Sequence, residues 1–325
     1  MGKVVAIFNQ KGGVGKTSSI SCLAAELHAR GKKVLVIDAD QQENLSVSLK
    51  VIPSNCLITI YDLLRKAIED DAFDRDLAEA IHHTEAGYDL IVGSVRMAGM
   101  DRQMLSVTQH ETRLDTFLVN YAEDNKGLRD KIEAAGLTED TKEYLREKKR
   151  FEDKTAKYKE KIIDAGLYRE IDGDFILREI LEPIRNSYDY ILIDCPPALS
   201  SVTINILTAA DRLIIPMTPE PFSAAGMTNL TANVEVVRRL NNPELKISGL
   251  LFTMVERRKV GNALIKATRD RYKGQMYIYN TMIPRSTDVN KSFALREPLI
   301  AYKKDNIARI AYSNFCDEFL EREEN

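Results

Sequence analysis

Short and almost continuously apolar runs alternate with helical patterns along most of the chain. Strands that are buried on both faces have this character, because helices cover both sides of a parallel sheet. Between the first two runs, apolar residues from Ile20 to Leu27 recur at helical spacing, and Gly31 stands where a helix cap is expected. The pattern predicts an α/β fold with a doubly wound, mostly parallel sheet. The runs expected to be strands are Val4–Phe8, Val34–Asp38, Leu90–Val92, Tyr190–Asp194, Leu213–Met217, Gly249–Thr253 and Tyr277–Ile283.

One stretch, from about residue 112 to 172, interrupts this rhythm and carries no strand signal. It is rich in charged residues, with sparse apolar positions at helical spacing and a turn signal at Gly136 and Thr138. We expect a charged helical hairpin inserted into a single domain that spans residues 1–325. The hairpin is either a solvated arm or an arm that docks a partner or DNA, since charge runs have both uses.

The composition narrows the classes of function. A net charge of −3 gives no basic field over the whole protein, so DNA binding would need a local patch. No apolar run reaches 18 residues and no signal peptide is recognisable, so a membrane-spanning segment is not expected. The four cysteines form no CxxC pair, which favours a reducing cytosol and argues against a zinc or iron–sulfur site: Cys22, Cys56, Cys195 and Cys316.

A glycine-rich segment, Asn9–Ser18, follows the first predicted strand and opens the first predicted helix. This is the context of a P-loop, in which backbone amides and the positive end of the helix bind phosphates. Lys16 would reach the β- and γ-phosphates, and the Thr17 hydroxyl would bind Mg²⁺. Gln10 stands where the usual motif has glycine. The residues predicted to bind ATP here are Lys11, Gly12, Gly13, Val14, Gly15, Lys16, Thr17 and Ser18.

The segment Lys11–Thr17, KGGVGKT, resembles the deviant Walker A motif of the ParA/MinD superfamily. The resemblance implies an ATP hydrolase whose extra lysine, Lys11, reaches across a dimer to the partner's nucleotide. Lys11 could then neutralise charge on the phosphoryl oxygens, as an arginine finger does. We therefore expect Lys11 and Lys16 to be catalytic, and ATP to drive homodimerisation.

Two carboxylates, Asp38 and Asp40, lie at the end of the second predicted strand, where they project to the same side. The segment resembles the family's D-x-D-P-Q motif, which implies that Asp40 positions the attacking water and that Asp38 supports Mg²⁺ or its waters. The chain departs from the motif at Gln41, where proline is usual, and at Glu43, where a small residue is common. The alternative is that both acids only cap the following segment.

A third carboxylate, Asp194, ends the apolar run Tyr190–Asp194, which resembles the family's Walker B motif and implies a Mg²⁺ site. Cys195 beside it is expected to be inert packing. Ile283 and Pro284 match a family segment that lies near the adenine base, although an apolar run with proline could equally end a strand.

A local basic patch follows the predicted strand Gly249–Thr253. Arg257, Arg258 and Arg285 are candidates for sequence-independent DNA contacts, and solvated surface charge is the alternative. The resemblance to ParA proteins implies a dimerising switch ATPase for plasmid or chromosome segregation, in the cytoplasm and on the nucleoid. A ParB-like centromere-binding protein would stimulate hydrolysis.

Other functions stay open on the same scaffold. A MinD-like ATPase would need a basic amphipathic helix to bind membrane, whereas the segment 315–325 is acidic, so a membrane partner is not expected. A cargo-positioning ATPase on the nucleoid would use the same mechanism as a partition protein. An iron–sulfur carrier would need paired cysteines, and a synthetase would need a substrate pocket that the sequence does not identify.

Overall fold

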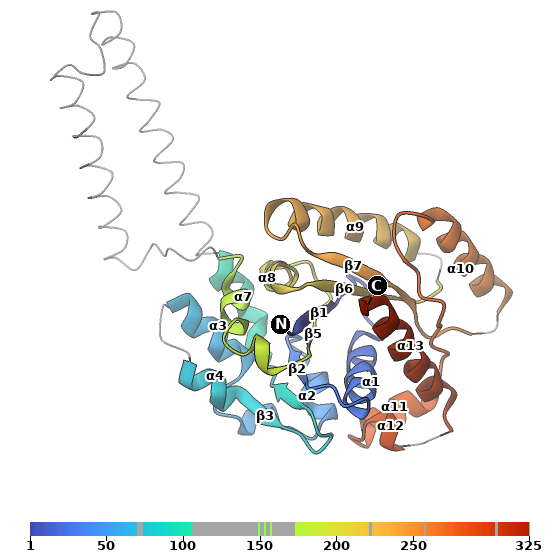
Figure 1. The fold of residues 1–325 in the computed structure, drawn as a ribbon, viewed down its shortest axis with the longest axis horizontal. Coiled ribbons are helices and arrows are strands. Elements are labelled where there is room, and N and C mark those ends of the chain that lie inside the picture. The colour runs from blue at the N-terminus through green and yellow to red at the C-terminus, as the bar shows by residue number, and fades with distance from the viewer. Residues whose placement is uncertain are drawn as a thin grey trace, which may run out of the picture. The chain divides into compact units, whose positions relative to one another are not determined.

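The computed structural model describes residues 1–69, 74–105, 149, 153, 157, 173–220, 223–256, 258–302 and 305–324. Residues 1–101 and 174–325 form one compact unit (Figure 1), and residues 102–173 form a second, of which few residues are described. The predicted hairpin, with its turn at Gly136 and Thr138, lies outside the described residues. That prediction and the single-domain assignment therefore stay predictions.

The first unit is built on a sheet of seven strands in the order β3-β4-β2-β5-β1-β6-β7 (Figure 1). Every strand pairing is parallel except that of β3 with β4. The predicted doubly wound, mostly parallel fold is confirmed. The strands are β1 (Lys3–Ile7), β2 (Val34–Asp38), β3 (Ile81–His83), β4 (Asp89–Ile91), β5 (Tyr190–Asp194), β6 (Arg212–Met217) and β7 (Lys246–Phe252).

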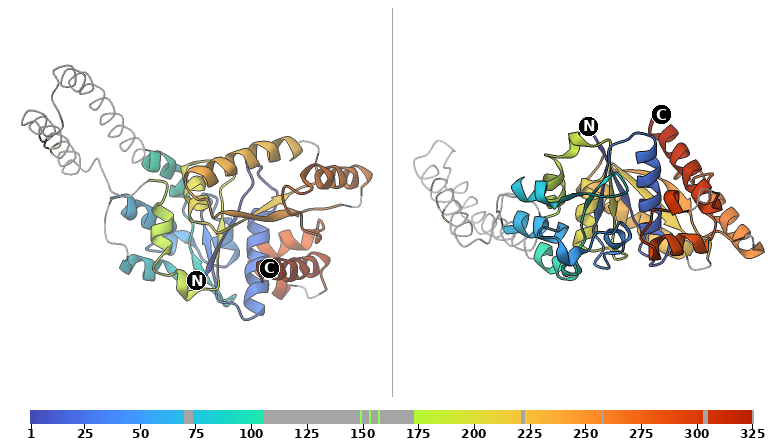
Figure 2. Two further views of the ribbon diagram at one scale, coloured as in Figure 1. Left: turned by 45° about the horizontal axis from the view of Figure 1, so that its top comes forward. Right: turned by 90° about the horizontal axis from the view of Figure 1, so that it is seen from below.

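Helices cover both faces of this sheet (Figure 2). The longer described helices are α1 (Lys16–Ala29), α3 (Ile60–Glu69), α8 (Ser201–Ala209), α9 (Ser223–Leu240), α10 (Lys259–Tyr272), α11 (Thr287–Ala294) and α13 (Ile307–Glu324). The shorter ones are α2 (Asn44–Ser48), α4 (Asp74–Ala80), α7 (Ile176–Leu181), α12 (Leu299–Tyr302) and the 3₁₀ turns η1 (Pro53–Asn55), η2 (Val95–Gly99) and η3 (Arg185–Ser187). Gly31 adopts φ 77° just after α1 and donates its N–H to the His28 carbonyl, as its predicted capping role requires.

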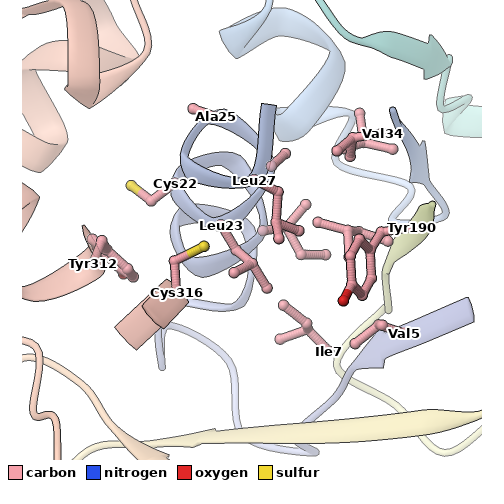
Figure 3. Packing of buried hydrophobic residues seen from close by; sticks show 14 of the residues in the cluster. Val5, Ile7, Cys22, Leu23, Ala25, Leu27, Val34, Tyr190, Tyr312 and Cys316 are labelled. Atoms are coloured by element: carbon pink, nitrogen blue, oxygen red, sulfur yellow. The ribbon is translucent and has the colours of Figure 1, made fainter. Parts of the chain in front are cut away.

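Alternate residues of the strands enter one large apolar cluster beneath α1 and α13 (Figure 3). Val5 and Ile7 of β1 pack there with Leu23 of α1 and Phe315 of α13, all of them fully buried. The intervening strand residues face the other helical layer, in which α8 contacts β1. Both faces of the strands are therefore apolar, which is why the strands appear in the sequence as continuous apolar runs.

The last described helix, α13, is fixed to the sheet by polar contacts as well. The Glu323 carboxylate accepts hydrogen bonds from Lys3 of β1 at 2.8 Å and from Arg212 of β6 at 2.8 Å. It also accepts one from Ser248 of β7 at 3.3 Å, and its side chain is only 4% exposed. One buried carboxylate thus joins α13 to three strands.

The segment Tyr277–Ile283, predicted as a strand, is not one. Its contacts with β7 are isolated: Ile278 forms a bridge with Leu250, the Ile283 N–H donates to the Phe252 carbonyl, and Pro284 just beyond forms a bridge with Val255. The carboxylate of Glu318 on α13 takes the N–H groups of Asn280 and Thr281, which removes them from any ladder.

The edge strand β3 was not predicted from the sequence. It has three residues, Ile81–His83, all at least partly exposed, and two of them are histidines, so it lacks the apolar run that marks the other strands.

Candidate functional site

The loop between β1 and α1 forms an open cradle at the carboxyl end of the sheet. Gly13 and Gly15 adopt φ 70° and 82°, which favour glycine because a side chain there would be strained. A Cβ at Gly12 or Gly13 would meet no atom within 4 Å, so space remains along the backbone where phosphates would lie. Gly15 immediately precedes the first residue of α1, and the helix dipole therefore favours an anion at this point.

Lys16 points into this cradle. Its side chain is 7% exposed, and its ammonium donates to the Asn9 carbonyl at 3.3 Å. This is the placement required of a lysine that binds phosphates from within the loop.

Two residues to which the sequence analysis gave no role hold the loop in place. The Asn9 side chain accepts from the Lys11 N–H at 2.9 Å and donates to the Pro216 carbonyl of β6 at 2.7 Å. The Thr253 hydroxyl, just past β7, donates to the Val14 carbonyl at 2.7 Å. Asn9 and Thr253 are far apart in sequence, and only the strand order brings them to one loop.

Asp38 and Asp194 lie side by side at the ends of adjacent strands, since the register of β2 and β5 pairs them directly. Both are fully buried. Burial raises the pKa of Asp38 to about 6 against the opposing effect of two hydrogen bonds from Ser46, whose N–H and hydroxyl lie 2.8 and 2.7 Å from Oδ2. Burial also raises the pKa of Asp194 well above its ordinary value, and the Asp38 charge adds to this rise.

These carboxylates fit a magnesium ion. Within the described part of the chain, Asp38 Oδ1 has no hydrogen-bond partner, and the Asp194 carboxylate has at most the Thr17 hydroxyl. Buried carboxylate oxygens without partners are costly unless a cation or water binds them. A hydrogen bond from the Thr17 hydroxyl and the positive charge of Lys16 partly oppose the rise in the pKa of Asp194, so both groups lie near this carboxylate. The described residues form no group of three or more Asp, Glu, His or Cys side chains that could hold a metal ion by themselves.

Asp40 lies on the turn between β2 and α2 and is half-buried. Its carboxylate accepts the Gln42 N–H at 3.0 Å, and its carbonyl accepts the Glu43 N–H at 3.1 Å. The carboxylate therefore stabilises its own turn, as the capping alternative expected. Glu43 has φ 55°, a conformation that explains the preference for a small residue at this point of the motif.

A pocket beside the cradle contains the two residues predicted near the adenine base. Ile283 and Pro284 line it together with Gly15 and Ser18 of the loop. Ile283 is buried, whereas Pro284 is half-buried. The arrangement places an apolar wall next to the start of α1, where a nucleotide base would follow its phosphates.

Of the candidate DNA-contact arginines, Arg285 lines the same pocket as Ile283 and Pro284, and Arg257 is outside the described residues. Arg258 and Arg285 are 77% and 69% exposed, and both pair with Glu256, at 2.6 and 2.8 Å. They line a hollow that also contains Gly13 and Glu220. The Glu256 carboxylate therefore offsets part of the positive charge of Arg258 and Arg285, and their role in DNA binding stays a prediction.

Lys11 lies at the exposed outer side of the phosphate loop. Its side chain is 41% exposed and forms an ion pair with Glu220, which follows β6. The Lys16 side chain therefore points into the cradle, whereas the Lys11 side chain points outwards.

Comparison with known proteins gives this site a context. A family model described as an AAA domain matches residues 2–125 and 155–247. An uncharacterised protein of Pseudomonas putida KT2440 is 31% identical, with 99% of this chain and 96% of that protein covered. The chromosome partitioning protein ParA of Myxococcus xanthus is 28% identical over 99% of this chain and 89% of its own length. The sporulation initiation inhibitor Soj of Bacillus subtilis is also 28% identical, over 98% of each chain.

Solved structures share the fold. Cobyrinic acid a,c-diamide synthase of Mycobacterium smegmatis, with bound ADP and magnesium, has a TM-score of 0.68 at 22% identity and covers 100% of this chain and 96% of its own. The septum site-determining protein MinD of Pyrococcus horikoshii, complexed with Mg-ADP, has a TM-score of 0.61 at 19% identity, covering 98% and 96%. With its glycine cradle, its buried lysine and its adjacent carboxylates, the chain belongs to the AAA-domain family and is a P-loop ATPase of the ParA/MinD type.

Proposed function

We propose that the protein is an ATP-dependent dimerising switch that segregates plasmid or chromosomal DNA. The observation that carries this proposal is the placement of the two loop lysines. Lys16 is buried within the cradle, whereas Lys11 is exposed on its outer side. One lysine would bind the protomer's own phosphates, and the other is free to reach those of a second copy once Glu220 releases it.

The site residues would divide the work of hydrolysis. Backbone amides of the cradle and Lys16 would hold the phosphates in line. Thr17, Asp38 and Asp194 would hold Mg²⁺, which supplies charge neutralisation at the β- and γ-phosphates when bound. Asp40 would orient the attacking water, and Lys11 of the second copy would stabilise charge that develops on the transferred oxygens.

DNA binding by the ATP dimer is supported by the exposure of Arg258 and Arg285 and by the ParA relatives over the full chain. Dimerisation would present the patch twice, and only the ATP-bound state would then bind DNA strongly. A ParB-like partner at a centromere-like site would stimulate hydrolysis and so release the dimer. We place this activity in the cytoplasm, on the nucleoid.

A MinD-like function on a membrane has less support. The acidic helix α13 buries Phe315 and Phe319 in the core of the first unit, so its apolar side is not available to lipid. None of the described helices is long and apolar enough to cross a membrane. Positioning of a protein cargo over the nucleoid would use the same switch.

The experiment is retention on nonspecific DNA with ADP, ATP or a nonhydrolysable analogue, with the molar mass followed by light scattering. We expect dimers and retention with ATP and the analogue only. Each lost phosphate contact should reduce the log–log salt slope by roughly 0.9. Equal retention with ADP would contradict the switch, and dimers that never bind DNA would contradict the role in segregation.

A further inference from the structure

Glu43 occupies an unusual backbone conformation for a residue with a long side chain. Its φ of 55° lies in the left-handed region, where non-glycine residues are strained, and such strain persists only where neighbouring contacts maintain it. Here the contact is a hydrogen bond across the site, since the Glu43 carboxylate accepts the N–H of Val95 at 2.7 Å.

This hydrogen bond joins two loops at the carboxyl end of the sheet. Glu43 ends the turn that carries Asp40, and its own N–H bonds the Asp40 carbonyl at 3.1 Å. Val95 is the first residue of η2, which follows β4. Ser46, three residues after Glu43, makes a second link between the two loops. Its hydroxyl accepts the Gly93 N–H at 3.0 Å and donates to the Asp38 carboxylate. The Asp40 turn is therefore attached to the β4–η2 segment at two points.

We propose that Glu43 is a positioning residue for hydrolysis, which fixes the orientation of Asp40 by anchoring its turn to the N–H of Val95. The inference rests on the proposed role of Asp40. Ser46 holds the buried Asp38, which precedes the turn, whereas Gln41 and Gln42 in the middle of the turn are exposed. The Glu43 carboxylate adds a restraint from the β4–η2 segment to the hydrogen bonds within the turn itself.

The hydrogen bond can be removed from either end with little strain. Glu43→Gly deletes the acceptor, and glycine adopts the left-handed conformation freely. Val95→Pro deletes the donor, since proline suits the first position of a 3₁₀ turn and the preceding Ser94 is extended. Val95 is 64% exposed, so little packing is lost. Glu43→Gln keeps an acceptor and should rescue the function.

Lys50 offers a matched control. It also has a positive φ, 63°, and lies just beyond the other end of α2, but its side chain pairs with the exposed Glu85. Lys50→Gly therefore relieves the same kind of strain without touching the Asp40 turn.

The test measures steady-state ATP hydrolysis, nucleotide affinity by calorimetry and unfolding for the full chain and each variant. We expect Glu43→Gly and Val95→Pro each to lower kcat by about 3- to 10-fold, the size of one lost hydrogen bond, with nucleotide affinity within twofold. The double variant should fall no further than either single one. Glu43→Gln and Lys50→Gly should keep kcat within twofold.

The outcomes separate this inference from the proposal on which it rests. Full kcat in Glu43→Gly, while Asp40→Asn abolishes turnover, would overturn the role of Glu43 alone. Additive losses in the double variant, or a parallel loss of affinity and stability, would reduce the contact to a structural one. Undiminished turnover in Asp40→Asn would remove Asp40 from the mechanism, and the positioning role of Glu43 with it.

Discussion

Gly93 lies so close to Asp38 that a single added methyl group tests the geometry of the carboxylates. A Cβ built at Gly93 would be 2.9 Å from Asp38 Cγ, 3.0 Å from its Oδ2 and 3.1 Å from its carbonyl oxygen. Ordinary contacts of this kind are 3.4–4 Å, so Gly93→Ala must displace either Asp38 or the end of β4. Both are buried in a packed sheet that yields little.

The cost follows from two effects. Overpacking of a rigid site destabilises by about 1–3 kcal/mol. Displacement would also weaken the link from the Gly93 N–H to Ser46 and on to Asp38, worth about 1 kcal/mol. We therefore expect Gly93→Ala to lower the free energy of unfolding by about 2–4 kcal/mol.

Chemical denaturation measures the stability, and calorimetry measures ADP affinity with Mg²⁺ and with EDTA. If Asp38 helps to hold Mg²⁺, Gly93→Ala should lower the affinity for ADP about 10-fold in the presence of Mg²⁺, the equivalent of about 1.4 kcal/mol. With EDTA, the affinity of this variant for ADP should equal that of the unchanged protein.

Gly99→Ala is the matched control, because it lies in the neighbouring turn η2, where a Cβ would meet nothing within 4 Å. Both changes restrict the unfolded chain equally. Equal stability of the two variants would show that the approach to Asp38 is not rigid, and equal affinity for Mg-ADP would separate Asp38 from the metal.

Four further outcomes are expected. Asp40→Ala should cut hydrolysis roughly 10²- to 10⁴-fold with ATP affinity preserved, and normal turnover would contradict its role. Lys11→Ala should retain ADP binding but lose ATP-dependent dimers in light scattering. Arg258→Glu with Arg285→Glu should abolish DNA retention and leave dimers intact; surviving retention would locate the DNA contacts elsewhere. Burial opposes ionisation of Glu318, but hydrogen bonds from one hydroxyl and two N–H groups prevail and lower its pKa below 4.5. Its stabilisation is therefore present above pH 4.5 and lost as the pH falls further, so Glu318→Gln should make acid unfolding curves shallower.

The sequence was sufficient for those parts of the site that are local. The phosphate loop is continuous in the chain, and Asp38 and Asp194 end apolar runs, so chemistry and position could be recognised together. Asn9 and Thr253 could not be assigned in this way, because the order of β1, β6 and β7 decides what they contact.

The strand predictions were wrong in two places, for reasons that the local sequence pattern does not show. The segment Tyr277–Ile283 has the apolar composition of a strand, yet Glu318, distant in sequence, captures two of its N–H groups. Conversely, β3 is a strand that was not predicted, because it has two histidines and is partly exposed and so lacks an apolar run. The sequence also did not indicate that Glu256 pairs with both Arg258 and Arg285 in the folded chain.

The attachment of α13 to the sheet has a consequence for how the protein is made. Glu323 and Lys3 are 320 residues apart, yet they join the helix to the first strand. While the ribosome is still translating the segment before α13, the apolar side of β1 and α1 lacks Phe315 and Phe319 and stays exposed to chaperones. A message cut short before this helix should therefore yield a polypeptide that is degraded.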